Sequence, residues 1–200
     1  RDLDALGSLL GLAETSPEAS VTEAALQALY QLVRGEAVTG DTGMLLVTSA
    51  IKMLTSMASR DLPPIHLLWL LYSLSSHQSL HNFLANQTFL YQCVYTATYE
   101  IFQKCDPRPL VKLLTPVVRI LANLAAGPDS VSVCLTLIRH PDLPAILTAL
   151  LSTNYLHLCR ESLWLFANIV NNESVNIKEE VVNKDFMDKL KPHSVQAICR

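Results

Sequence analysis

Apolar residues recur along most of this chain at the three- and four-residue spacing of an α-helix. The clearest example is the segment 156–170, where the spacing i, i+4, i+7, i+8 and i+11 is followed by Cys159, Leu163, Phe166, Ala167 and Val170. We expect this stripe to be buried, because residues at that spacing share one helix face. The chain shows no sustained apolar/polar alternation and no Asn-Gly or Asp-Gly dipeptide, the patterns that predict strands and hairpins. The pattern therefore predicts an all-α protein.

Turn-forming residues divide this pattern into helices of roughly 10–18 residues, the length expected of helical repeats. The breaks fall at 14–17, 35–43, 60–64, 106–109, 127–129, 140–142, 152–154 and 171–174. In the first break, Ser16 predicts an N-cap and Pro17 the first position of a helix. Pro116 predicts either another helix start or a kink within one longer helix.

Four of the predicted helices share one register. The segments 26–32, 68–74, 118–124 and 163–169 align without gaps, and their second residues lie 42, 50 and 45 positions apart. Armadillo and HEAT repeats have a period of about 40–47 residues. Each segment follows an earlier apolar one, at 3–12, 44–57, 89–102 and 143–151, with which it can pair. We therefore predict one domain of about four stacked repeats (1–35, 36–76, 77–127 and 128–172) with a partial repeat at 173–200, and we expect it to be a piece of a longer solenoid.

Composition narrows the functional classes. Half of the 200 residues are apolar and 16% are charged. The longest uninterrupted apolar stretch, 67–72, is far shorter than the roughly 20 residues that span a bilayer, so we expect no membrane segment. The net charge is −3 without any block of basic residues, which argues against a nucleic-acid partner. The five cysteines are odd in number and lack C-x-x-C spacing, which favours a reducing compartment over disulfides or a zinc site.

Polar residues on the aligned helices form the candidate site. Glu161, Trp164 and Asn168 follow the spacing i, i+3 and i+7, and Arg119 and Asn123 follow i, i+4 one repeat earlier. Each set shares one helix face. An asparagine amide both donates to and accepts from a peptide backbone, and a tryptophan ring attracts a Lys or Arg side chain by about 0.5–2 kcal/mol. The two sets therefore predict a surface for an extended peptide.

The same residues resemble those of a known family. Trp164-x-x-x-Asn168, with Glu161 before it, is similar to an armadillo repeat of the importin-α (karyopherin-α) family. The preceding repeat is similar to the one importin-α repeat that replaces the Trp with Arg, through Pro116, Arg119, Asn123, Gly127 and Asp129. Trp69 matches the Trp of the repeat before it. The chain also resembles a divergent importin-α-like branch, which lacks the Trp in the repeat equivalent to 27–31.

The resemblance implies a right-handed armadillo superhelix and an adaptor in cytoplasm and nucleus. Such an adaptor holds basic nuclear-localisation peptides in a concave groove for protein transport into the nucleus, alongside other transport factors. The implied groove residues are Trp69, Arg119, Asn123, Asp129, Glu161, Trp164 and Asn168, of which Asp129 and Glu161 would attract ammonium groups. Ser73 departs from the family pattern, as do Gln27 and Gln31. These departures favour the alternative, a scaffold of the same fold with a degenerate groove and a folded protein as its partner.

Packing offers another explanation for several of these residues. Trp69 and Trp164 fit a buried aromatic as well as a displayed one. Asn168 fits a hydrogen bond to a neighbouring helix, and Arg119 fits an ion pair with an acidic side chain. These alternatives stay open at the level of sequence.

Motifs for catalysis, cofactors and metals are incomplete. His77 and His81 have the i, i+4 spacing of a helical metal pair, but no Glu follows His77 and no third ligand is evident. The stretch 35–42 imitates a phosphate-binding loop, but Asp41 stands where the motif requires Lys. The chain has no G-x-S-x-G nucleophile motif. We therefore expect a non-enzymatic protein that holds neither metal nor cofactor.

Overall fold

A computed structural model describes residues 2–35, 38, 40–56, 63–103 and 107–182. Within these ranges the chain forms eleven α-helices and one short 3-10 helix, and no strand. The all-α prediction is confirmed. The chain divides into two compact units, Arg1–Leu84 and Ala85–Arg200, and each is described by itself. The single domain, the repeat boundaries and the superhelix that the sequence suggested stay predictions.

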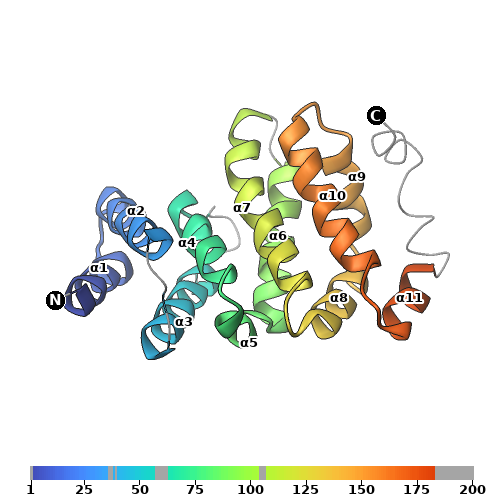
Figure 1. The fold of residues 1–200 in the computed structure, drawn as a ribbon. Helices are drawn as coiled ribbons and strands as arrows, with labels where there is room; N and C mark the ends of the chain where they lie inside the picture. Colours follow the sequence, from blue (N-terminus) through green and yellow to red (C-terminus); the bar gives the residue numbers. More distant parts are fainter. Residues whose placement is uncertain (1, 36–37, 39, 57–62, 104–106, 183–200) are drawn as a thin grey trace. The chain divides into compact units, whose positions relative to one another are not determined.

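The first unit consists of packed helix pairs (Figure 1). Its elements are α1 (Asp2–Thr15), α2 (Ala19–Gly35), α3 (Gly40–Ser56), α4 (Ile65–Ser75), the 3-10 helix η1 (Gln78–Leu80) and α5 (His81–Leu84). Helix α2 lies between α1 and α4, and α3 packs on α1, α4 and α5. Helix α4 buries leucines on several sides, because neighbouring helices contact more than one of its faces.

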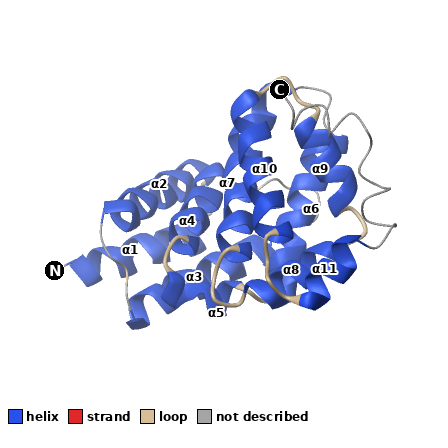
Figure 2. Cartoon of the chain, turned by 45° about the vertical axis from the view of Figure 1, so that its right-hand side comes forward, coloured by secondary structure: helices blue, strands red, loops and turns tan. Residues whose placement is uncertain are grey.

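The second unit likewise consists of packed helices (Figure 2). Its elements are α6 (Gln87–Gln103), α7 (Pro107–Ala125), α8 (Ser130–Ile138), α9 (Leu143–Leu151), α10 (Leu156–Val170) and α11 (Val175–Val182). Helix α10 packs along α7, while α6 contacts α7, α8 and α9. The side-by-side placement of α7 and α10 sets the geometry of the candidate site.

The structure tests two helix starts that prolines suggested in the sequence. Helix α2 begins at Ala19, so the prediction that Pro17 opens the helix is wrong by two residues. The Ser16 hydroxyl accepts a hydrogen bond from the Glu18 backbone N–H at 3.2 Å, which makes a turn ahead of the helix instead of a cap on Pro17. Helix α7 runs through Pro116, so this proline lies inside one longer helix and does not begin another.

The buried stripe of α10 differs from the predicted one by one residue. The fully buried positions are Leu158, Ser162, Leu165 and Ile169, whereas the predicted Cys159, Leu163, Phe166, Ala167 and Val170 are only partly buried. The buried stripe contains a serine, which a pattern of apolar residues alone does not identify. The Ser162 hydroxyl donates to the Leu158 carbonyl oxygen at 2.8 Å, so its burial leaves no unpaired donor.

Among the described helices, none is long and apolar enough by itself to cross a membrane. Helices α8 and α9 reach that length and hydropathy only as a pair, and the chain bends by 89° between them.

Candidate functional site

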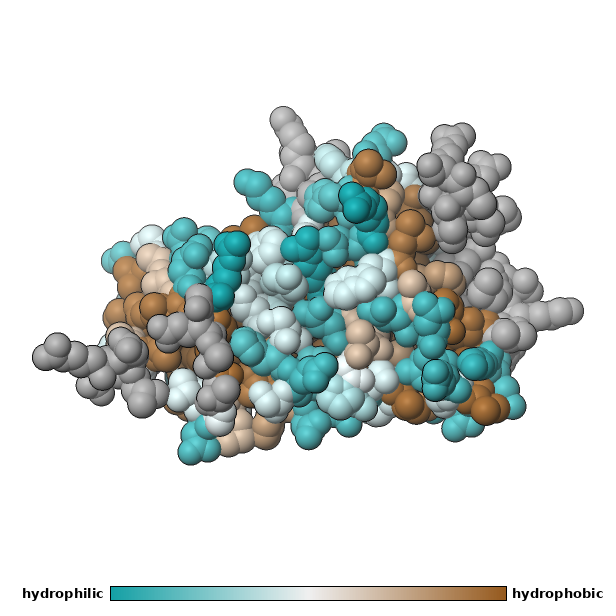
Figure 3. All heavy atoms as spheres, viewed as in Figure 1, coloured by the Kyte–Doolittle hydropathy of each residue, from teal (hydrophilic) through white to brown (hydrophobic). Residues whose placement is uncertain are grey.

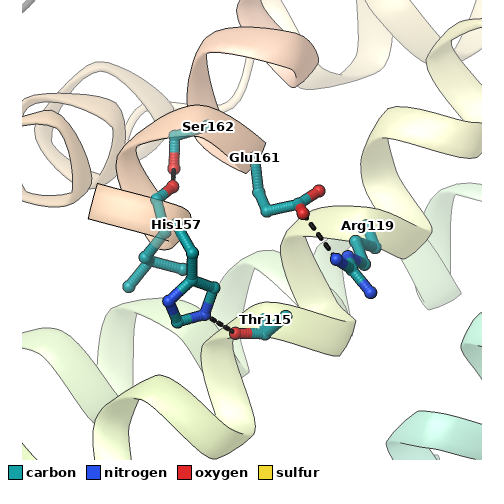
Figure 4. A network of polar contacts seen from close by, with 6 residues as sticks. Thr115, Arg119, His157, Glu161 and Ser162 are labelled. Atoms are coloured by element: carbon teal, nitrogen blue, oxygen red, sulfur yellow. Dashed lines mark hydrogen bonds and ion pairs between the residues drawn. The ribbon is translucent and has the colours of Figure 1, made fainter. Parts of the chain in front are cut away.

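A series of polar bridges joins α7 to α10 in the second unit. Thr115 and His157 share a hydrogen bond of 2.9 Å, and one turn further the Arg119 guanidinium donates to the Glu161 carboxylate at 2.6 Å (Figure 4). Each pair is separated by 42 residues, three fewer than the 45 that separate equivalent positions of these two repeats, so each α7 residue bonds to the α10 residue about one turn before its own equivalent. The bridges therefore hold one repeat to the next along the candidate surface.

Two asparagines continue this series toward the end of α10. The Asn168 side-chain N–H donates to the Ala122 carbonyl oxygen at 3.0 Å, and the Asn172 side-chain N–H donates to the Ser130 hydroxyl at 3.1 Å. The alternative in which Asn168 bonds to a neighbouring helix is thus confirmed. An amide has two N–H donors and a carbonyl with two lone pairs, and the bond to Ala122 uses one of these four positions.

The ion pair between Arg119 and Glu161 is partly buried. The two side chains are 30% and 18% exposed, so water screens their attraction less than it would at an open surface. The alternative in which Arg119 pairs with an acid is confirmed. Because the pair is neutral overall, Glu161 offers a cationic ligand less attraction than an unpaired carboxylate would.

Trp164 is displayed at the surface, whereas Glu161 and Asn168, one turn to either side of it, are only partly exposed. The tryptophan is 42% exposed, although Leu165 beside it is buried. Of the two alternatives for Trp164, a buried ring and a displayed one, the structure shows the displayed ring. It lies one helical turn from both Glu161 and Asn168, so the indole, the carboxylate and the amide share one face of α10.

Asn123 and Asp129 occupy the end of α7 and the turn that follows. Asn123 is half-buried one turn beyond Arg119, on the same face of α7. Asp129 is the residue before α8 and is half-buried, and its side chain makes no capping hydrogen bond to that helix. Their roles toward a peptide stay predictions.

The first unit has an aromatic cluster that sequence reasoning missed. Trp69 on α4 is half-buried, with the Tyr30 ring 6.0 Å away on α2 and the Tyr72 ring 5.6 Å away on α4. The alignment of 26–32 with 68–74 gives Tyr30 and Tyr72 equivalent positions, and this signal could have revealed the cluster. Gln27 is exposed in the first unit, and Ser73 is buried.

The buried thiols have structural environments. Burial raises the pKa of Cys93, and it raises the pKa of Cys134 to about 11. Burial also raises the pKa of Cys159, whose thiol donates to carbonyl oxygens at and just beyond the end of α9, the nearest being Thr153 at 3.3 Å. A raised pKa lowers the population of the nucleophilic thiolate.

No group of three or more His, Cys, Asp or Glu side chains gathers into a metal site within the described ranges. Of the two histidines at i, i+4 spacing, His81 is buried and its ring Nε2 is hydrogen-bonded to the Ser75 carbonyl oxygen at 2.7 Å.

Hydrophilic and hydrophobic side chains are mixed across the visible face of the second unit (Figure 3). Within the described part of this unit, the exposed large hydrophobic side chains are Tyr91, Tyr95, Val131, Leu156, Trp164 and Val175.

Comparison with known proteins supports the fold. No protein-family model matches the chain, and no curated protein matches it. The structure is similar to the crystal structure of an engineered protein from the Northeast Structural Genomics Consortium, with a TM-score of 0.66 and 16% sequence identity. The match covers 99% of this chain and 78% of the engineered one. At this identity the likeness concerns the fold alone, and the chain is a helical repeat protein.

Proposed function

We propose that this protein is a non-enzymatic adaptor that binds an extended basic peptide across α7 and α10, in the manner of the importin-α family. The observation that carries the proposal is the exposed Trp164, which shares its helix face with Glu161 and Asn168. Repeat proteins use such continuous helical surfaces to bind extended partners. The cargo is of the nuclear-localisation type, and the adaptor works in cytoplasm and nucleus.

Each residue of this surface has a chemical task toward the peptide. The Trp164 indole stacks on the aliphatic part of a Lys or Arg side chain and attracts its charge, which contributes about 0.5–2 kcal/mol. Asn123 and Asn168 hydrogen-bond the peptide backbone, for which Asn168 retains positions beyond its bond to Ala122. Glu161 and Asp129 attract the charged ends. With one tryptophan–asparagine set on this surface, we expect a Kd of tens of micromolar, about −6 kcal/mol.

A titration of a labelled Lys/Arg-rich peptide, followed by fluorescence anisotropy at low and physiological salt, tests the proposal. Binding should weaken clearly as salt screens the charges. Trp164→Ala and Asn168→Ala should each weaken binding by roughly 1–2 kcal/mol, through lost stacking and unpaired backbone groups respectively. Tyr91→Ala is a matched control, because Tyr91 is an exposed aromatic of α6 in the same unit.

A second function is favoured by the bonds already made on this surface. Arg119 donates a hydrogen bond to Glu161, and Asn168 donates one to the Ala122 carbonyl oxygen. The side chains of Glu161 and Asn168 therefore already join α10 to α7. These bonds suit a scaffold that binds a folded partner on a helical face. If wild type and the Trp164→Ala/Asn168→Ala double variant bind the basic peptide equally, the scaffold replaces the adaptor. Nuclear accumulation of a reporter that carries the same peptide tests the transport role separately.

A further inference from the structure

The first unit contains a pocket between the C-terminal parts of α2 and α4. Its volume is about 210 Å³, and its lining consists of Tyr30, Val33, Arg34, Tyr72, Ser73, Ser76 and His77. That volume is roughly that of seven water molecules at about 30 Å³ each. Pockets that enclose drug-sized molecules begin at about 300 Å³. The pocket is therefore sized for one functional group on a larger ligand.

The repeat register explains why a pocket exists at this place. In the alignment of the long helices, Ser73 stands where the second unit has Asn168, and Tyr30 stands where it has Ala122. In the second unit the Asn168 amide crosses to the Ala122 carbonyl oxygen. Ser73 is too short to make that crossing, and the space is walled by the phenol rings of Tyr30 and Tyr72 instead.

The lining is rich in hydrogen-bond donors and carries positive charge. Arg34 contributes a guanidinium at the last turn of α2, and the described residues that line the pocket include no carboxylate. The Tyr30, Tyr72 and Ser73 hydroxyls add further polar groups, whereas the Ser76 hydroxyl donates to the Ser73 carbonyl oxygen. A guanidinium without a carboxylate beside it favours an anionic group.

The carbonyl oxygens at the end of α4 do not reverse this preference. The C-terminus of a helix carries partial negative charge, which would favour a cation. Here the Ser73 carbonyl accepts from the Ser76 hydroxyl at 2.6 Å, and the Tyr72 carbonyl accepts from the Ser75 hydroxyl at 2.7 Å. The His77 backbone N–H donates to the Leu74 carbonyl at 3.1 Å. With these acceptors engaged, the charge of Arg34 dominates the pocket.

We propose that this pocket binds an oxyanion, either a phosphate or a carboxylate, on a side chain of an acidic peptide. Arg34 bonds the oxyanion, while Tyr30 and Tyr72 form the walls. The site lies within the first unit and has the opposite charge preference to the basic-peptide surface of the second, so either can fail without the other.

The fluorescence emission of Trp69 can report binding in this pocket. The chain has two tryptophans, so Trp164→Phe leaves Trp69 as the only one, in ring contact with both tyrosine walls. In that background, three peptides that differ only in a central serine, phosphoserine or glutamate are titrated into the protein. We expect a saturable change in Trp69 emission with the phosphoserine peptide, competed by inorganic phosphate, and none with the serine peptide. If the glutamate peptide also changes Trp69 emission, a carboxylate is sufficient for binding. If only the phosphoserine peptide does so, the site is specific for phosphate.

Three substitutions locate the binding. Arg34→Gln should weaken it at least about tenfold, because a charged hydrogen bond is lost. Lys52→Gln removes the same charge from an exposed side chain of α3 in the same unit and should leave the affinity unchanged. Ser73→Asn introduces the amide that fills the equivalent space in the second unit and should also weaken binding about tenfold or more, with helical content retained.

Three results would overturn the proposal. The first is the absence of any saturable response to either acidic peptide. The second is equal loss of affinity in Lys52→Gln and Arg34→Gln. The third is equal or tighter binding of a peptide with lysine at the central position.

Discussion

Arg119→Ala, Glu161→Ala and the double variant form a cycle that measures what the ion pair between α7 and α10 contributes to the free energy of unfolding. The joined nitrogen and oxygen atoms lie 2.6 Å apart, and the side chains are 30% and 18% exposed. At an effective dielectric constant of about 20, unit charges about 4 Å apart attract by roughly 4 kcal/mol, and desolvation and ordering cancel much of this. We expect a coupling free energy of about 1–2 kcal/mol, above the ~0.2–1 kcal/mol of exposed pairs.

Urea denaturation of the four proteins, followed by the circular dichroism of the helices, gives this coupling energy. The coupling should decrease as salt rises toward ~1 M, but less than for an exposed pair, because burial limits screening. Arg160→Ala is the control, since Arg160 is an exposed neighbour on α10 and its loss changes the net charge equally. A coupling below ~0.3 kcal/mol, within the scatter of independent sites, would show that the pair does not hold the two helices together.

The same variants connect the ion pair to peptide binding. Removing Arg119 takes away the guanidinium that pairs with the Glu161 carboxylate, so Arg119→Ala should bind a basic peptide about three- to tenfold more tightly at low salt, although it is less stable. Glu161→Ala should bind the peptide more weakly, because the remaining guanidinium repels it. Fluorescence anisotropy measures both affinities. Weaker binding by Arg119→Ala would refute this electrostatic account of the surface.

Three further predictions concern helix backbone, packing and thiol chemistry, the first two measured by urea denaturation. Gly11→Ala should raise the free energy of unfolding by about 0.5–1 kcal/mol, because nothing lies within 4 Å of the added Cβ in α1. Gly40→Ala should lower the free energy of unfolding by about 1 kcal/mol, because Gly40 has a φ of +61° that an alanine rarely adopts. Leu165→Ala should cost about 2–5 kcal/mol and Phe166→Ala clearly less, since only Leu165 is fully buried; equal costs would contradict the observed stripe. Alkylation of Cys134, mapped by mass spectrometry, should be slow at about pH 8.5 and speed up toward pH 11, because burial raises its pKa to about 11. The thiol's contribution to stability should be lost as pH rises from about 8.5, the pKa of an unfolded thiol, through about 11.

The sequence by itself determined the helices and their shared register. Helix formation depends on local periodicity and on turn residues, so the helix 143–151 was predicted with the bounds that α9 has in the structure. The sequence also placed Trp164 on one face of its helix with Glu161 and Asn168, although it left open whether the ring is buried or displayed. The first residue of α2 was harder to predict, because a serine such as Ser16 forms a turn ahead of a helix as readily as it caps the helix.

Only the tertiary structure decided which partner each side chain has. Two apolar stripes one residue apart on α10 satisfy helical periodicity equally well, and packing selected the one that contains Ser162, whose hydroxyl bonds within its own helix. The partners of Arg119 and Asn168 lie 42 and 46 residues away in sequence, so no local pattern specifies them. The pocket beside Ser73 likewise depends on how α2 packs against α4. Its lining comes from both helices, so the sequence of either helix alone does not predict it.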